Sequence, residues 1–372
     1  MHGHLDSHAR VDSRAFRRAA LWGGLLASWF FLASVGASPA DAASKSLRFL
    51  TWDEYTDPDL IAEFEAAHDV DIELFYYETD EERDEVLVQS QGRGYDVILV
   101  SDDALGRYQG RGWLVGMNES SVPNLKFMEK RWRQTAADGK DYGIPYAWGT
   151  SGIAYRSDLV SEPITGWIDL LRPQPSIQGK ILMVADSWEL VGIALLALGY
   201  DFNSEDPSQL DAAGNLLLSQ RGFVSRYGYP NLSEESSLVS GETVAATMYS
   251  GDALALKDVD PRITYVVPEE GTFLWCDYLT VATASSDPKL ALAFIDFLQV
   301  PKNAARTSEY LYYPSPNEAA TKLLPEELLT DENVYPSSDA LAHAFRYEAM
   351  APRTIRKRSS IYQNVVGNIA AQ

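Results

Sequence analysis

Carboxylates and aromatic rings stand close together at several points of the 372-residue chain. A carboxylate accepts hydrogen bonds from an ammonium group, which has three donors and no acceptor. The face of a Trp or Tyr ring covers hydrocarbon and adds cation–π attraction of roughly 0.5–2 kcal/mol. The residues that combine these properties are Trp52, Asp53, Glu54, Tyr55, Asp186, Glu189, Tyr249, Asp252, Trp275 and Asp277. Their chemistry is compatible with a cationic ligand.

Residues of the kinds that most enzymes and metal sites use are scarce. Beyond residue 42 the only histidines are His68 and His343, and Cys276 is the only cysteine of the chain. Neither a Gly-x-x-x-x-Gly-Lys phosphate loop nor a Gly-x-Ser-x-Gly elbow occurs. We therefore expect no enzyme activity, no catalytic residue, no metal site and no cofactor.

The charge balance argues against one class of partner. The chain has 53 acidic and 31 basic residues, for a net charge of -22. Binding of nucleic acid needs clustered Lys and Arg, so we expect no nucleic-acid partner. The excess of acid is compatible with a cationic ligand and equally with a surface that is acidic for solubility.

The first 42 residues have the pattern of a secretory signal peptide. Arg14, Arg17 and Arg18 precede an apolar run over residues 19–35, and small residues flank Asp41 before the expected cleavage after Ala42. We expect a periplasmic protein, with a retained membrane anchor as the alternative. A single cysteine allows no intrachain disulfide. No cysteine lies near the expected cleavage site, so we expect no lipid anchor attached through cysteine.

Strands and helices alternate over the next sixty residues. Apolar runs predict strands at 46–51, 70–77 and 95–100, separated by helices from Asp57-Pro58 and over 79–90. This order predicts a parallel sheet, and ligands bind beyond the carboxyl ends of such strands. Trp52–Tyr55 and Ser101-Asp102-Asp103 occupy that position. We expect Asp102 to cap a helix. Trp52 and Tyr55 cannot have that role, because an aromatic side chain does not cap a helix.

A second alternating series follows a Gly- and Pro-containing crossing at residues 142–155. Strands are expected at 180–184, 244–249 and 263–267, with helices at 186–198, 210–219 and 253–257, a return crossing at 272–284 and a helix at 289–298. The pattern predicts an α/β protein of two lobes, each a mostly parallel sheet flanked by helices. We place lobe 1 at 43–148 and 279–320, and lobe 2 at 149–278 and 321–372.

The chain resembles, over nearly its whole length beyond residue 42, the spermidine/putrescine-binding proteins of polyamine importers of the ATP-binding-cassette class. The resemblance rests on seven landmarks in the right order and spacing. They are Trp52-Asp53-Glu54-Tyr55, Tyr95 to Ser101, Ile144 to Gly149, Asp186-Ser187-Trp188-Glu189, Tyr249-Ser250-Gly251-Asp252, Trp275-Cys276-Asp277 and Tyr313-Pro314-Ser315-Pro316-Asn317.

The resemblance implies a two-lobe, Venus-flytrap periplasmic binding protein of type II. We also expect a monomer whose partners are the polyamine ligand and the importer's membrane permease subunits. The resemblance also implies a ligand contact at each landmark. Asp53 or Glu54 would accept from an amine, Ser101 would accept a hydrogen bond, and Tyr313 would donate one. Trp52, Tyr55, Tyr249 and Trp275 would flank the ligand, and Asp186, Glu189, Asp252 and Asp277 would hold its ammonium groups.

Two residues depart from the family pattern. Tyr249 stands where the family usually has Trp, and Asp103 stands where an aromatic or small residue is common. If Asp103 faces the ligand, it adds an anion to the site. The choice between putrescine and spermidine therefore stays open. Alternative functions are a ferric-ion-binding protein using Tyr312-Tyr313, a hydrolase using Glu189 and Asp277, and a polyamine sensor.

Overall fold

The computed structural model describes residues 45–367. The predicted signal peptide lies outside the described residues. Within them, no helix is long and apolar enough to cross a membrane.

Three parallel strands form one end of a mixed sheet: β1 (Lys45–Thr51) lies between β2 (Val70–Tyr76) and β3 (Val97–Ser101). Helix α1 (Pro58–His68) joins β1 to β2, and α2 (Asp80–Ser90) joins β2 to β3. Alternate residues of β3 enter hydrophobic clusters on opposite faces of the sheet. This burial of both faces explains why residues 97–100 are entirely apolar. The predicted strands and helices of this series are confirmed within a few residues.

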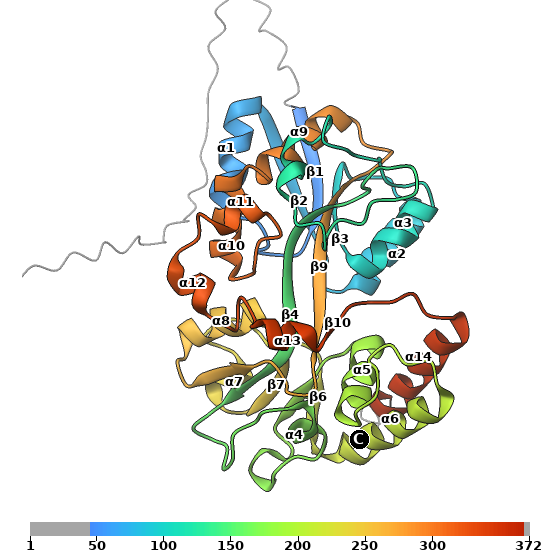
Figure 1. Ribbon diagram of the computed structural model, residues 1–372, viewed down its shortest axis with the longest axis vertical. Helices are drawn as coiled ribbons and strands as arrows, with labels where there is room; N and C mark the ends of the chain where they lie inside the picture. Colours follow the sequence, from blue (N-terminus) through green and yellow to red (C-terminus); the bar gives the residue numbers. More distant parts are fainter. Residues whose placement is uncertain (1–44, 368–372) are drawn as a thin grey trace, which may run out of the picture. The chain divides into compact units, whose positions relative to one another are not determined.

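Two long strands, β4 (Ile144–Arg156) and β9 (Thr272–Val281), run antiparallel through the sheet and connect its two ends (Figure 1). The C-terminal part of β9 pairs with β3, so Asp277 lies opposite Ser101. The C-terminal part of β4 pairs instead with β7 (Ala245–Tyr249) and β8 (Ile263–Val266). The predicted crossings at 142–155 and 272–284 therefore correspond to these long strands.

The other end of the sheet continues with β5 (Ile181–Met183) between β7 and β6 (Val224–Tyr227), in parallel pairs. Helix α5 (Ser187–Ala197) starts just beyond β5 and is buried over most of its length. It packs against α6 (Pro207–Gln220), and α8 (Ser250–Val259) directly follows β7. The carboxyl ends of β5 and β7 thus lead into the helices that carry Glu189 and Asp252.

The remaining elements cover the sheet or close the chain. Near the C-terminus, β10 (Ala344–Phe345) pairs with the start of β9, and α14 (Pro352–Val366) packs on α5 and α6. The others are α3 (Asp102–Gly110), α4 (Trp167–Leu171), α7 (Ser237–Ser240), α9 (Pro288–Leu298), α10 (Pro301–Leu311), α11 (Glu318–Thr321), α12 (Glu326–Thr330), α13 (Ser338–Ala342) and three short 3-10 helices, Pro123–Phe127, Pro175–Ile177 and Arg221–Phe223.

Candidate functional site

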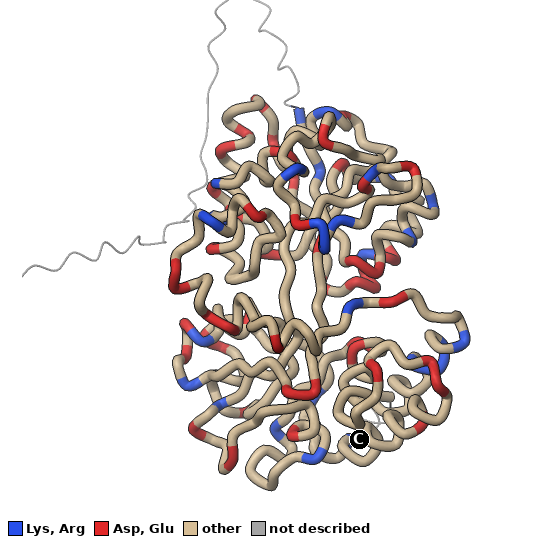
Figure 2. Tube along the Cα trace, in the orientation of Figure 1, with Lys and Arg blue, Asp and Glu red and all other residues tan. Residues whose placement is uncertain are grey.

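Hydrogen bonds and ring contacts connect six of the thirteen predicted site residues in one group, which we call the acid–tyrosine cluster. Each of its three carboxylates accepts a hydrogen bond from at least one tyrosine hydroxyl. The cluster consists of Tyr55, Glu189, Tyr249, Asp252, Asp277 and Tyr313. Its members come from the segment after β1, the first turns of α5 and α8, the end of β7, the strand β9 and the segment after α10. Acidic residues occur along much of the backbone on both sides of the long strands (Figure 2).

Asp277 lies in the middle of the sheet, in β9 between β3 and β4. Its residue is only 7% exposed, and its Oδ2 accepts a 2.8 Å hydrogen bond from the Tyr55 hydroxyl. Burial raises the pKa of Asp277 to about 8; the Tyr55 hydrogen bond opposes the shift and the negative charge of Asp80 adds to it. No described Lys, Arg or His forms an ion pair with this carboxylate. The site therefore holds an acid that a ligand cation would stabilise in its charged form.

Glu189 provides a second buried carboxylate, 4% exposed, in the first turn of α5. It accepts hydrogen bonds from Ser151 Oγ and, at 3.2 Å, from the Tyr249 hydroxyl. Burial raises its pKa to about 7 against these hydrogen bonds, with a further contribution from Asp186. Asp186 caps α5 by accepting from the backbone N–H groups of Trp188 and Glu189, and burial raises its pKa to about 6.

Asp252 is the third carboxylate of the cluster, in the first turn of α8. It accepts from the hydroxyls of Tyr313 at 2.8 Å and Tyr229 at 2.6 Å. Burial raises its pKa, while the two tyrosine hydrogen bonds act in the opposite direction. Tyr229 also accepts from the backbone N–H of Tyr249, so it connects this carboxylate to the end of β7.

Aromatic rings link the three carboxylates. The ring of Trp275 meets those of Tyr313 and Tyr249 edge-on, at centroid distances of 4.7 and 5.8 Å, and Tyr313 lies 6.2 Å from Tyr55. A Cβ at Gly149 would lie 2.5 Å from the Trp275 ring, so the crossing strand β4 requires glycine at this contact. The arrangement provides apolar surface between anionic groups, as a cation with a hydrocarbon chain requires.

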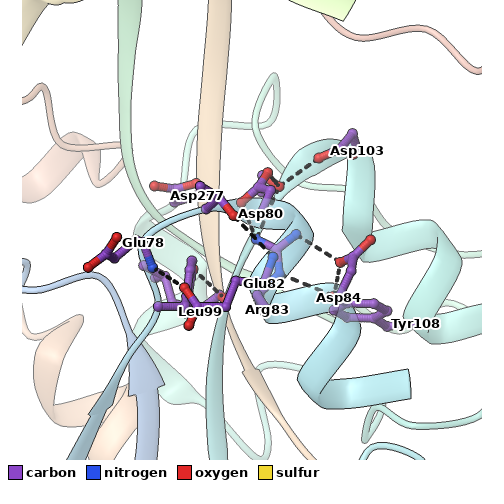
Figure 3. Close-up of polar contacts among 12 residues, drawn as sticks. Glu78, Asp80, Glu82, Arg83, Asp84, Leu99, Asp103, Tyr108 and Asp277 are labelled. Atoms are coloured by element: carbon purple, nitrogen blue, oxygen red, sulfur yellow. Dashed lines mark hydrogen bonds and ion pairs between the residues drawn. The ribbon is translucent and has the colours of Figure 1, made fainter. Parts of the chain in front are cut away.

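Ser101 ends β3 opposite Asp277, and Asp103 lies in the first turn of α3, near Asp80 in Figure 3. Ser101 Oγ is 2.8 Å from Asp80 and 2.6 Å from Asp103. Burial acts to raise the pKa of Asp103, but Arg107 and Ser101 outweigh it, so that the pKa is lowered. Asp103 is therefore an ionised group that already has a cation partner. Trp52 packs on Tyr77, with a distance of 4.2 Å between the ring centroids.

Asp53 and Glu54 differ from the other predicted site residues, all of which are buried or half-buried. Both are exposed in a turn, with Glu54 in the left-handed backbone region at φ 53°. They line a pocket of about 220 Å³ together with Trp52 and Tyr55, so this pocket adjoins the cluster at Tyr55. Their predicted contact with an amine has no counterpart among the contacts of the cluster.

Three further expectations can be compared with the contacts. The predicted capping role of Asp102 is wrong: Asp102 is the first residue of α3, and its carboxylate lies 3.5 Å from the Arg346 guanidinium. Tyr312 and Tyr313 do not converge, because their hydroxyls bond to Asp258 and Asp252 respectively. Among the described residues no group of three or more His, Cys, Asp or Glu side chains is arranged to hold a metal ion.

Sequence reasoning missed Tyr77, Asp80, Arg83 and Tyr229. Asp80 lies shortly after the carboxyl end of β2, and Ser101 lies at the carboxyl end of β3. The rule that ligands bind beyond the ends of parallel strands could therefore have indicated Asp80. Tyr229 follows β6 in the same way, but no strand was predicted at residues 224–227. Arg83 lies in a run of charged residues that gives no signal of burial.

Comparisons with known proteins support a solute-binding role. Residues 59–334 match the family described as bacterial extracellular solute-binding protein. The chain is 28% identical over 319 residues to the spermidine/putrescine-binding periplasmic protein of Escherichia coli, covering 85% of this chain and 90% of that protein. It is also 28% identical over 356 residues to a putrescine/agmatine-binding protein of Pseudomonas aeruginosa, covering 90% and 96%.

A solved structure shows the same fold. The spermidine/putrescine ABC transporter substrate-binding protein PotD from Streptococcus pneumoniae superposes with a TM-score of 0.75 at 26% identity. The match covers 87% of this chain and 98% of the other. The predicted α/β periplasmic-binding-protein fold is confirmed, and its sheet is mixed because β4 and β9 contribute antiparallel pairs.

Proposed function

The chain belongs to the family of bacterial extracellular solute-binding proteins, and on this premise we propose that it binds a polyamine, putrescine or spermidine, in the acid–tyrosine cluster. It would do so as the periplasmic component of an ATP-binding-cassette importer and pass the ligand to the membrane permease subunits. The polyamine specificities in the names of its relatives support this assignment. Its role is binding and delivery rather than catalysis.

One observation carries the proposal: three desolvated carboxylates, Glu189, Asp252 and Asp277, have tyrosine partners but no ion pair with a described Lys, Arg or His. Isolated buried anions are costly unless a cation pairs with them. A polyamine supplies ammonium groups at intervals, and its methylene groups would lie on the ring of Trp275. Asp186 and Ser101 stand next to these groups as further acceptors.

The alternatives explain the geometry less well. A ferric site built on Tyr312 and Tyr313 would need both hydroxyls to face one ion, whereas they bond to different carboxylates. A hydrolase using Glu189 and Asp277 would leave Asp252, Tyr229 and Trp275 without a function. A polyamine sensor would use the same cluster and differs only in the partner that reads out binding.

A thermal-shift panel tests the proposed ligand. Putrescine, cadaverine, spermidine, spermine, agmatine, neutral and acidic amino acids and ferric citrate would be added to the protein lacking residues 1–42. A ligand present at about one hundred times its dissociation constant stabilises the fold by roughly 2.7 kcal/mol. We expect a shift with at least one polyamine and none with the amino acids. A panel without any polyamine shift would refute the assignment.

We further propose that residues 43–148 and 279–320 act as one lobe, and 149–278 and 321–372 as the other, and that the lobes close on the ligand. Support comes from β4 and β9, which are the long strands joining the two ends of the sheet, and from the hinge closure typical of periplasmic binding proteins. Small-angle scattering should show a smaller radius of gyration at saturating polyamine. An unchanged radius would contradict closure.

A further inference from the structure

Arg83, in α2, is a completely buried cation beside the acid–tyrosine cluster. Its side chain has 0% exposure, and its guanidinium bonds to Asp80 at 2.5 Å and to Asp84 at 3.2 Å. It also donates to the Tyr108 hydroxyl at 3.1 Å, and Tyr77 lies against it with a ring centroid 5.4 Å away (Figure 3). A guanidinium in such surroundings stays charged at all ordinary pH values.

The carboxylates around Arg83 form ion pairs with arginines, unlike the three carboxylates of the cluster. Asp80 and Asp84 pair with Arg83, and Arg107 pairs with both Asp84 and Asp103 at 2.8 and 2.7 Å. No such pairing exists among the described residues for Glu189, Asp252 or Asp277. The carboxylates at the α2 and α3 side are therefore neutralised from within the protein, whereas those of α5, α8 and β9 are not.

The Arg83 charge lies within electrostatic reach of the cluster. Asp80 bonds to Ser101, and Ser101 is the residue directly opposite Asp277 in the β3–β9 pair. Burial and Asp80 raise the pKa of Asp277, and Arg83 acts against them. A ligand ammonium beside Asp277 would accordingly experience both the attraction of Asp80 and the repulsion of Arg83.

We propose that Arg83 is a resident cation of the binding site, a specificity-determining residue that limits how strongly the site favours more highly charged ligands. The inference rests on the polyamine binding proposed above. Because the Arg83 charge offsets the charges of Asp80 and Asp84, it lowers the negative potential of the site, and this loss of attraction grows with the number of ammonium groups that the ligand carries. Putrescine with two is penalised least, spermidine with three more, and spermine with four most.

Arg83→Gln tests the proposal by removing the resident charge. Dissociation constants for putrescine, spermidine and spermine would be measured by calorimetry at pH 8. The affinity for spermine should rise relative to that for putrescine by about tenfold, with spermidine in between. Arg262→Gln is the control, because it removes a charge from a half-exposed arginine that pairs with Asp260 outside the cluster, and it should leave the ratio within about twofold.

Asp80→Asn provides a second test that keeps Arg83 and so does not depend on the folding of Arg83→Gln. Here the guanidinium keeps Asp84 as its one paired carboxylate, so the site becomes less negative; binding should weaken, most for spermine and least for putrescine, and the double variant should return towards the wild-type ratio. If either folded single variant changes the three affinities by equal factors, Arg83 is only structural. If no polyamine binds the wild type, the proposed function itself fails, which is a different result.

Discussion

Replacing Asp277 by Asn is expected to weaken polyamine binding by about a hundredfold or more. Asp277 is buried in β9, and its carboxylate accepts a 2.8 Å hydrogen bond from the Tyr55 hydroxyl. Removing one member of a buried ion pair costs about 3–5 kcal/mol, because the other charge is left without a partner. In the variant that charge is the ligand's ammonium group. Calorimetric titration of the variant with the ligand found for the wild type measures the effect.

Asp258→Asn is the matched control for this experiment. Asp258 also accepts from a tyrosine hydroxyl, that of Tyr312 at 2.6 Å, but it is exposed and lies outside the cluster. The same chemical change there should alter affinity by less than about threefold. If the Asp277→Asn variant is folded and binds the ligand as tightly as the Asp258→Asn variant, Asp277 does not contribute to ligand binding.

The second large effect is expected at Glu189, where Gln should weaken ligand binding and yet stabilise the empty protein. Burial raises the folded-state pKa of Glu189 to about 7, above its ordinary value of 4.5. The folded protein therefore binds more protons than the unfolded chain between these values, so this group makes stability fall as pH rises from about 4.5 to 7. At pH 8 the cost of ionising Glu189 is of order 3 kcal/mol.

Urea denaturation of the wild type and Glu189→Gln at pH 5 and pH 8 tests this prediction. At pH 8 the variant should be the more stable by roughly 1–3 kcal/mol in the absence of ligand, and near pH 5 the difference should largely disappear. Ligand affinity at pH 8 should fall at the same time. A variant that is less stable than the wild type at pH 8 would show that Glu189 supports the empty fold instead of opposing it.

The sequence predicted much of the framework because the pattern of each strand is local. Residues 97–100 are apolar on both faces, and Pro58 follows a capping Asp57, so the strand and the helix start could be recognised without tertiary information. The positions of Glu189, Asp252 and Asp277 depended on the family resemblance. Their spacing in the chain alone does not show that α5, α8 and β9 meet.

Other parts of the site could not be read from the sequence. Asp53 and Glu54 adjoin Trp52 and Tyr55, but the left-handed backbone at Glu54 turns this short segment so that the acids face solvent. Arg83 belongs to the charged run Asp80 to Glu85, which contains no apolar residue to indicate burial. The Arg83 guanidinium can be buried because it bonds to Asp84 of α2 and to Tyr108 of α3. The contact with α3 depends on the tertiary structure, which the sequence does not show.

Equilibrium dialysis with labelled putrescine and spermidine tests most directly whether this chain binds a polyamine in the acid–tyrosine cluster. The wild-type protein at pH 8 should retain up to one molecule of at least one of the two ligands per chain, and excess unlabelled ligand should displace it. Asp277→Asn should retain little at the same concentrations. Absence of saturable retention by the wild type, or equal retention by both proteins, would contradict the account.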